Sequence, residues 1–296
     1  MRDFLLFSGS SNQPLAREVA KLLNISLGKV ELTRFIDNEC RVYVKERVEG
    51  KKVFVLESLS EVADQHLVEL CLLGQALKDL KAREVTAIIP WMGYSKQDRA
   101  FRKGEAVSAS LVAKFIEVAG FDRVITCELH SQKVLAYFHI PVVELSTKKI
   151  FGRYSGIVVS PDKGGESRSE EFAKHIGMPI VYLSKTRGLT TGEVTVTGIS
   201  DSVSGKDCVI FDDIINTGAT AIKTSEYLKQ HGAGNIFLLA THGVLAGDAK
   251  TKLESSRIDE VVVTDTIHIS KDKLFPKLRI VSIAPILADA ISRVVR

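Results

Sequence analysis

The sequence predicts an α/β protein of two tandem domains, each a mostly parallel sheet flanked by helices. Short runs of β-branched and apolar residues alternate with helical patterns along the whole chain, as is typical of parallel strands buried on both faces. Strand–turn–helix units with carboxylates or small-residue loops recur on either side of residue 146. We therefore expect one domain over residues 1–146 and a second over residues 147–296.

The elements follow from local patterns. The predicted strands are 4–8, 52–57, 85–90, 122–128, 156–160, 207–213, 235–241 and 260–265. A first helix is expected after Asn12, because Pro14 suits a first turn and Leu15, Val19 and Leu22 follow at helical spacing. A longer helix is expected over 63–80, where a stripe of leucines predicts a buried face.

Composition bounds the possible partners and the compartment. The chain has 296 residues, 45% hydrophobic and 26% charged, with a formal net charge of +4. It has no long run of Lys and Arg, so we expect no nucleic-acid partner. No apolar stretch approaches the roughly 18 residues of a membrane span, and the first residues predict a strand rather than a signal peptide. The four cysteines, Cys40, Cys71, Cys127 and Cys208, form no C-x-x-C pair; we expect buried thiols in a reducing cytoplasm.

One segment carries the strongest functional signal. Residues 209–220 place an apolar strand, the adjacent Asp212 and Asp213, and a turn of small residues directly before a helix. Such a turn can bring backbone N–H groups together around a phosphate, and the helix adds its positive dipole end. Carboxylates at the strand end can accept hydrogen bonds from hydroxyl groups. An ordinary Asp-rich turn is the alternative for the two acids alone, but the whole segment predicts a sugar-phosphate site.

The loop 212–220 resembles the phosphoribosyl pyrophosphate signature of type I phosphoribosyltransferase folds. Further segments spread over nearly the whole chain are Phe7-Ser8-Gly9-Ser10-Ser11, Phe35-Ile36-Asp37-Asn38-Glu39, Tyr94-Ser95-Lys96-Gln97-Asp98-Arg99, Glu128-Leu129-His130, Ser160-Pro161-Asp162-Lys163-Gly164-Gly165 and Lys185-Thr186-Arg187. In order and spacing they are similar to the ribose-phosphate pyrophosphokinase family. The resemblance implies two phosphoribosyltransferase-like domains. It also implies transfer of the β,γ-diphosphoryl group of ATP to the 1-hydroxyl of ribose 5-phosphate, which yields phosphoribosyl pyrophosphate and AMP.

The resemblance also implies a role for each matching residue. Asp212 and Asp213 would face the ribose hydroxyls. Lys185 would stabilise the transferring phosphoryl charge, with Arg187 facing the substrate and Arg99 as a further catalytic cation. The residues implied to hold the 5-phosphate are Asn216, Thr217, Gly218, Ala219 and Thr220.

The ATP and metal sites are implied in the same way. Phe35, Asp37, Asn38 and Glu39 resemble the family's adenine pocket, and Lys96 and Gln97 of a neighbouring subunit would complete it. His130 would contact ATP and, with Asp162, organise Mg²⁺, which keeps waters and phosphate oxygens among its ligands. The basic segment 96–105 is suited to close over the triphosphate. Homo-oligomers built from dimers, up to hexamers, are implied as well.

Each of these residues also has a plainer interpretation. His130 alone would be a structural histidine, Asp162 a turn residue, and 185–187 a solvated strand end, while Phe35 would be core and 96–105 an exposed loop. Three other functions compete: a phosphoribosyltransferase, a non-catalytic partner of an active synthetase, and a DNA-binding regulator. The duplicated architecture disfavours the transferase, the intact motif side chains disfavour the non-catalytic partner, and no helix-turn-helix precedes the first strand.

The chain departs from the family pattern in several places. Lys96 replaces an Arg and so lacks the planar fork that stacks on a base, Glu128 replaces an Asp, and Asn216 replaces an acid. Gly104-Glu105-Ala106 replaces a segment with Arg and Pro. Where phosphate-activated members bind an oxyanion, this chain has Gln132, Leu135, Val143 and Glu144. An apolar side chain and an acid disfavour a phosphate, so we expect neither phosphate activation nor allosteric inhibition by ADP.

Overall fold

The computed structural model describes residues 4–187 and 194–296. The chain divides into two compact units. The first comprises Met1–Ser146, Thr266–His268 and Ser282–Arg296, and the second comprises Thr147–Asp265 and Ile269–Val281. The second unit therefore ends before the last helix, whereas the expected second domain ran to residue 296. That helix packs on the first unit, against its first helix.

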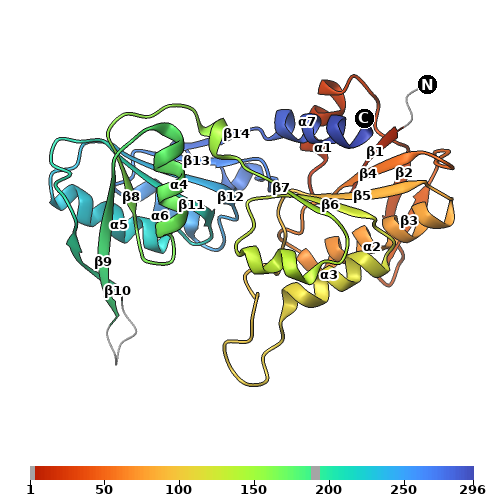
Figure 1. Cartoon of the computed structure of the whole chain (residues 1–296), viewed down its shortest axis with the longest axis horizontal. Coiled ribbons are helices and arrows are strands. Elements are labelled where there is room, and N and C mark those ends of the chain that lie inside the picture. Colours follow the sequence, from red (N-terminus) through yellow and green to blue (C-terminus); the bar gives the residue numbers. More distant parts are fainter. Residues whose placement is uncertain (1–3, 188–193) are drawn as a thin grey trace. The chain divides into compact units, whose positions relative to one another are not determined.

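The first unit is built on a parallel five-stranded sheet. Its strands, in spatial order, are β1 (Phe4–Ser8), β4 (Lys52–Leu56), β5 (Glu84–Ile89), β6 (Arg123–Cys127) and β7 (Val142–Leu145). The helices are α1 (Gln13–Leu22), α2 (Ala63–Asp79), α3 (Ser108–Val118), α7 (Ala284–Val295) and the 3₁₀ helix η1 (Gln132–Tyr137). Helices α1 and α7 cover one face of the sheet, and α2 and α3 cover the other (Figure 1).

Local signals explain where the first helices begin and which face they bury. Asn12 caps α1, with its side chain accepting a hydrogen bond from the N–H of Leu15, and proline occupies the first turn, as predicted. Leu15 and Val19 are buried, but Leu22 is 52% exposed. In α2 the leucines Leu67, Leu70, Leu73 and Leu77 are buried, which confirms a core face, but Leu72 and Leu80 are 38% and 44% exposed, so the expected buried stripe does not reach the end of the helix.

An antiparallel hairpin stands apart from the main sheet of the first unit. Strands β2 (Val30–Arg34) and β3 (Cys40–Val44) pair only with each other, and β3 packs on α2. Residues 35–39 form the turn between them, and inside it the N–H of Asn38 donates to the carbonyl of Phe35 at 2.9 Å.

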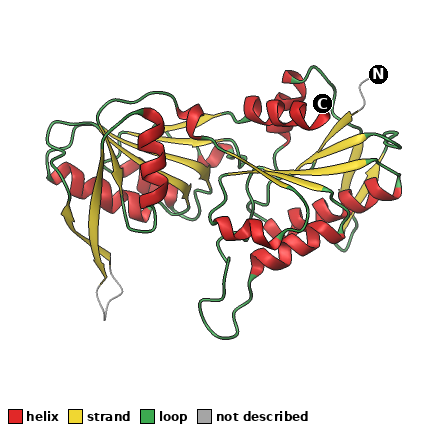
Figure 2. Cartoon of the chain, in the orientation of Figure 1, coloured by secondary structure: helices red, strands yellow, loops and turns green. Residues whose placement is uncertain are grey.

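The second unit contains a seven-stranded sheet. Its spatial order is β10 (Val194–Ile199), β9 (Ile180–Arg187), β8 (Ile157–Ser160), β11 (Cys208–Ile215), β12 (Ile236–Gly243), β13 (Glu260–Thr264) and β14 (Leu278–Val281), and only β10 runs antiparallel to its neighbour. The helices are α4 (Glu166–Ile176), α5 (Ala219–Gln230), α6 (Ala249–Ser255) and the 3₁₀ helices η2 (Lys148–Phe151) and η3 (Lys271–Lys273). Figure 2 shows helices on both sides of this sheet.

Three aromatic rings join helix α4 to the sheet of the second unit. The rings of Phe172, on α4, and Phe211, on β11, stack with centroids 4.1 Å apart and planes 4° apart. Phe151 meets both rings edge-on. All three rings are buried, so large apolar surfaces hold α4 on the strand that carries Asp212.

The predicted fold class is confirmed, and each of the eight predicted strands corresponds to an observed one within a few residues. Strands β2, β3, β7, β9, β10 and β14 were not predicted. All four cysteines are free, but only Cys127 and Cys208 are buried, whereas Cys40 and Cys71 are half-buried, so the expectation of four buried thiols was wrong for two of them. Among the described residues, no helix combines the length and the apolar character needed to cross a membrane.

Candidate active site

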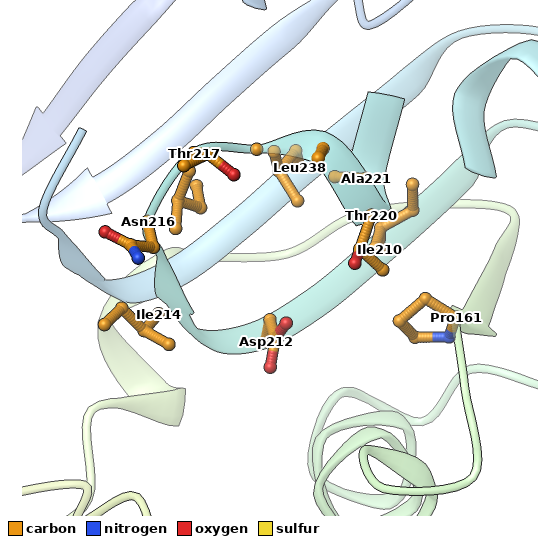
Figure 3. A pocket seen from close by; sticks show the side chains of 12 residues that line it. Pro161, Ile210, Asp212, Ile214, Asn216, Thr217, Thr220, Ala221 and Leu238 are labelled. Carbon is orange, nitrogen blue, oxygen red and sulfur yellow. The ribbon is translucent and has the colours of Figure 1, made fainter. Parts of the chain in front are cut away.

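A loop of small residues joins β11 to α5 and borders a cavity of about 150 Å³ (Figure 3). Strand β11 ends at Ile215 and α5 begins at Ala219. The lining comprises Pro161, Ile210, Asp212, Ile214, Ile215, Asn216, Thr217, Gly218, Ala219, Thr220, Ala221 and Leu238. The structure thus brings together all five predicted loop residues and Asp212 at the positive end of a helix, which is an arrangement suited to a phosphate.

Gly218 makes the tight entry into α5 possible. Its φ is +73°, in the left-handed region, and its carbonyl accepts the N–H of Ile222 at 2.9 Å. A Cβ at this position would lie 2.9 Å from Cδ2 of Leu253. Glycine is therefore favoured both by the backbone conformation and by the close approach of α6.

The loop is also tied to the segment after β12. The carbonyl of Asn216 accepts the N–H of Ala246 at 2.9 Å, and the carbonyl of Ile215 accepts the N–H of Leu245 at 3.1 Å. These bonds occupy two carbonyl oxygens of the loop with N–H groups of the segment after β12. A negatively charged group in the cavity thus meets fewer carbonyl oxygens, which would repel it.

The two adjacent carboxylates have different environments. Asp212 borders the cavity, whereas Asp213 is only 2% exposed and is not part of the lining. Nη1 of Arg168, on α4, lies 2.7 Å from Oδ1 of Asp212 and 3.0 Å from Oδ1 of Asp213. One guanidinium nitrogen therefore bridges both acids.

The pair has an altered ionisation. Burial, followed by the charge of Asp213, raises the pKa of Asp212 to about 7, and Arg168 opposes this rise. The two acids are adjacent, and Asp213 is almost fully buried while Asp212 is partly buried, so a second negative charge is costly. When both acids are ionised, their oxygens can only accept hydrogen bonds, and a proton on Asp212 removes part of this accepting capacity.

Arg168 was missed in the sequence analysis. No motif marks it, because its contact with Asp212 spans 44 residues of sequence. The available signal was its position one helical turn before the buried Phe172, which directs both side chains to the same face of α4.

Asp162 lies in the turn between β8 and α4. Its Oδ1 accepts the N–H of Gly165 at 3.1 Å, and its carbonyl accepts the same N–H. The plainer interpretation of Asp162 as a turn residue is thus part of its role. Because Pro161 lines the cavity, the turn borders the same carboxyl end of the sheet as Asp212.

Lys185 and Arg187 lie at the end of β9. The backbone of Lys185 pairs with Val196 and that of Arg187 with Val194, both on β10. The side chains of Lys185 and Arg187 lie outside the described residues, so their predicted catalytic roles remain predictions.

The predicted adenine pocket falls on the tip of the β2–β3 hairpin. Phe35 is 52% exposed, so the alternative that it is a core residue was wrong. The N–H of Glu39 donates to the Asp37 side chain at 3.3 Å. Arg34 donates to the carbonyl of Asn38 at 2.9 Å and to the side chain of Gln65, on α2, at 2.8 Å. An exposed ring is thus presented on a turn anchored to a helix.

The remaining nucleotide candidates follow β5. The ammonium of Lys96 lies 5.8 Å from the ring centroid of Trp91, and the guanidinium of Arg99 lies 5.0 Å from that of Phe101. Gln97 accepts the hydroxyl of Ser108 at 2.5 Å. Residues 96–107 form no helix or strand, in agreement with a long loop carrying cations.

His130 follows β6 and is exposed. The segment before it is fixed by β7, because Glu144 accepts the N–H of Leu129 at 2.6 Å and Ser146 donates to Glu128 at 2.8 Å. Within residues 4–187 and 194–296, no group of three or more His, Cys, Asp or Glu side chains is placed to enclose a metal ion.

The parallel sheets and the strand–loop–helix cradle define a protein of the type I phosphoribosyltransferase fold. Residues 4–120 match the family model described as the N-terminal domain of ribose phosphate pyrophosphokinase, and residues 157–296 match the phosphoribosyl synthetase-associated domain. The ribose-phosphate pyrophosphokinases of Helicobacter hepaticus and Ralstonia nicotianae are 40% and 41% identical to this chain. The alignments cover 99% of this chain and 96% and 95% of those proteins.

The crystal structure of phosphoribosylpyrophosphate synthetase from Mycobacterium smegmatis is also similar. It superposes with a TM-score of 0.91 at 34% identity, covering 99% of each chain. The chain therefore belongs to the ribose-phosphate pyrophosphokinase family.

Proposed function

We propose that this chain transfers the β,γ-diphosphoryl group of ATP to the 1-hydroxyl of ribose 5-phosphate, forming phosphoribosyl pyrophosphate and AMP. The observation that carries the proposal is the full-length similarity to ribose-phosphate pyrophosphokinases, joined to a phosphate-sized cradle bordered by Asp212. No bond to the protein need form, because the attacking oxygen belongs to the sugar. The protein must align two substrates and stabilise charge.

The cradle supplies the sugar-phosphate end of this task. We assign the 5-phosphate to the loop 216–220, where the N-terminus of α5 favours an anion. Asp212 and Asp213 would bind ribose hydroxyls directly or through their shared network. A phosphate held at one end and hydroxyls held at the other would direct the 1-hydroxyl toward ATP.

Cationic side chains would stabilise the phosphoryl charge at the ATP end of the reaction. Lys185 and Arg187 at the end of β9, and Arg99 in the loop after β5, would stabilise charge on the transferring phosphoryl oxygens and on the leaving AMP. Phe35 offers an exposed ring on which adenine can stack. Asp37, Asn38 and Glu39 offer hydrogen-bonding groups beside it, and His130 would contact the phosphates.

Mg²⁺ is general in this family, and the donor set fits it. An imidazole and a carboxylate cannot enclose a metal, which suits an ion that keeps waters and phosphate oxygens. We propose His130 and Asp162 as protein ligands. The bound ion would neutralise triphosphate charge and orient its oxygens.

We further propose a homo-oligomer in which Lys96 and Gln97 of one subunit complete the adenine pocket of another. Dimers, assembling up to hexamers, are the expected forms. The four free cysteines support a reducing compartment such as the cytoplasm.

The test is to incubate the purified chain with Mg²⁺, ATP and ribose 5-phosphate and to follow phosphorus NMR. We expect AMP and phosphoribosyl pyrophosphate in equal amounts. Lys185→Ala should lower the rate by at least about 100-fold, whereas Lys174→Ala, at an exposed position late in α4, should not. Absence of AMP under all conditions would overturn the proposal.

A further inference from the structure

We infer that Arg168 is a positioning residue that holds the carboxylates of Asp212 and Asp213 for ribose 5-phosphate. The inference rests on the proposed function. It concerns how the acids are presented to the sugar, because Arg168 itself does not line the cavity.

The contact geometry is that of a bridge. A single nitrogen, Nη1, reaches Asp212 at 2.7 Å and Asp213 at 3.0 Å. The side chains of Arg168, Asp212 and Asp213 are 22%, 33% and 3% exposed, so water screens the contact with Asp213 weakly and the contact with Asp212 only in part. Charge-assisted hydrogen bonds of this length are among the stronger polar contacts in proteins.

The position of Arg168 is fixed by packing one turn away. Phe172 is four residues later on α4 and stacks on Phe211, which immediately precedes Asp212 on β11. The same helix–strand contact that buries the two rings therefore sets the distance from Arg168 to the acids. A guanidinium placed by such packing loses little conformational freedom when it binds the carboxylates of Asp212 and Asp213.

The charges around the pair explain why a cation is needed. Asp212 faces Asp213 on its own strand and Arg168 on α4. Across the register on β12 its partner is Ala240, and the nearest titratable group on that strand is the buried His242, opposite Ile214. Strand β8, on the other side, carries no charged residue. Among these groups Arg168 is the cation that opposes the rise in the pKa of Asp212 caused by burial and by Asp213.

Removing the guanidinium would have two consequences. The pKa of Asp212 would rise further, by about one pH unit or more, since an opposite charge this close typically lowers a carboxyl pKa by about 1–3. The carboxylates would also lose the group that fixes their orientation. Both effects weaken binding of the sugar and leave ATP binding unchanged.

The experiment measures KM for ribose 5-phosphate, KM for ATP and kcat between pH 6 and 9. It compares the wild type with Arg168→Gln, Arg168→Met, Arg168→Lys and the control Lys174→Gln on the same helix. We expect the Gln and Met variants to raise the KM for ribose 5-phosphate about 10-fold or more and to move the midpoint of its pH dependence upward by about one pH unit. The KM for ATP should change less than twofold. Arg168→Lys should restore the wild-type midpoint of this pH dependence, because lysine keeps the positive charge beside Asp212.

A double-mutant cycle separates positioning from general damage to the fold. Combining Arg168→Gln with Asp212→Asn should give a KM close to that of Asp212→Asn alone, because the arginine acts through that carboxylate. Fully additive effects, or an unchanged pH midpoint in Arg168→Gln, would overturn the inference. The phosphate of the substrate titrates near pH 6 but does so identically in all variants.

The outcomes also distinguish the two proposals. If the wild type forms no phosphoribosyl pyrophosphate, the proposed function fails. If the wild type is active and Arg168→Gln matches it, only the role of Arg168 fails. Melting temperatures and circular dichroism accompany the kinetics. If neither the Gln nor the Met variant folds, the residue is structural and the positioning role is overturned.

Discussion

Ser10 binds Glu69 through two hydrogen bonds, from its N–H to Oε1 at 2.6 Å and from its hydroxyl to Oε2 at 3.0 Å. The next residue, Ser11, donates its N–H to Oε1 of Glu57 at 3.2 Å. Oε2 of Glu57 is buried without a hydrogen-bond partner. Burial and, next, the charge of Glu69 raise the pKa of Glu57 well above its ordinary value. The loop after β1 is thus anchored by two neighbouring acids, one of which favours its protonated form.

Glu57→Gln should therefore stabilise the first unit at neutral and alkaline pH. Because the folded-state pKa of Glu57 is raised, its contribution to stability is complete below its ordinary pKa and is lost as the pH rises through the raised value. Glutamine does not titrate, so it stays uncharged at every pH and does not repel Glu69. We expect a gain of about 1–2 kcal/mol at pH 8, shrinking toward pH 5, in denaturant unfolding.

The matched control for that experiment is Glu69→Gln. Both oxygens of Glu69 accept hydrogen bonds from Ser10, and an amide NH₂ cannot replace an accepting oxygen. This variant should be less stable than the wild type. Equal pH dependence in the wild type and Glu57→Gln would contradict the assignment of the buried acid.

Gly218→Ala should disable the phosphate cradle. The alanine Cβ would clash with the side chain of Leu253. Residue 218 would also keep a left-handed backbone conformation that non-glycine residues seldom adopt, at a cost of about 1–3 kcal/mol. Movement of the loop away from Leu253 would raise the KM for ribose 5-phosphate by at least about 10-fold. Gly177→Ala is the control, since its φ is +71° but no atom lies within 4 Å of its Cβ position. It should lower stability and leave the KM unchanged; equal kinetic effects in both variants would refute the steric argument.

Asp212 should make sugar binding depend on pH. With a pKa of about 7, its carboxyl gains a proton as the pH falls through neutrality, so the KM for ribose 5-phosphate should rise below about pH 7. Asp212→Asn should have a higher KM and lack this titration. If the rise in the KM for ribose 5-phosphate below pH 7 were also seen in Asp212→Asn, the titration would belong to another group.

Phe35 should contribute to ATP binding and hardly at all to folding. Its ring is half exposed, and stacking of a base on an aromatic ring is worth about 1–3 kcal/mol. Phe35→Ala should therefore raise the KM for ATP by about 5-fold or more with little change in melting temperature. Ile36→Ala is the neighbouring control, because Ile36 is fully exposed. An unchanged KM in Phe35→Ala would remove Phe35 from the adenine pocket.

Inorganic phosphate should not activate this enzyme. Glu144 accepts hydrogen bonds from Leu129 N–H at 2.6 Å and from Gln132 at 2.8 Å, so a carboxylate already occupies these two donors. Activity at saturating substrates should be flat from zero to tens of millimolar phosphate, and ADP should compete with ATP only. A several-fold increase in rate with added phosphate would contradict this prediction.

The sequence by itself determined eight strands of the two mostly parallel sheets, the small-residue loop at 216–220 and the family. These depend on short-range features: apolar runs, Asn12 and Pro14 at a helix start, and small residues before α5. The tertiary structure decided which side chains meet across long stretches of chain. Arg168 reaches Asp212 over 44 residues, Ser10 reaches Glu69 over 59, and α7 joins the first unit. Such contacts follow from how helices pack on sheets, where no local pattern specifies the partner, so they emerge only once the chain is folded.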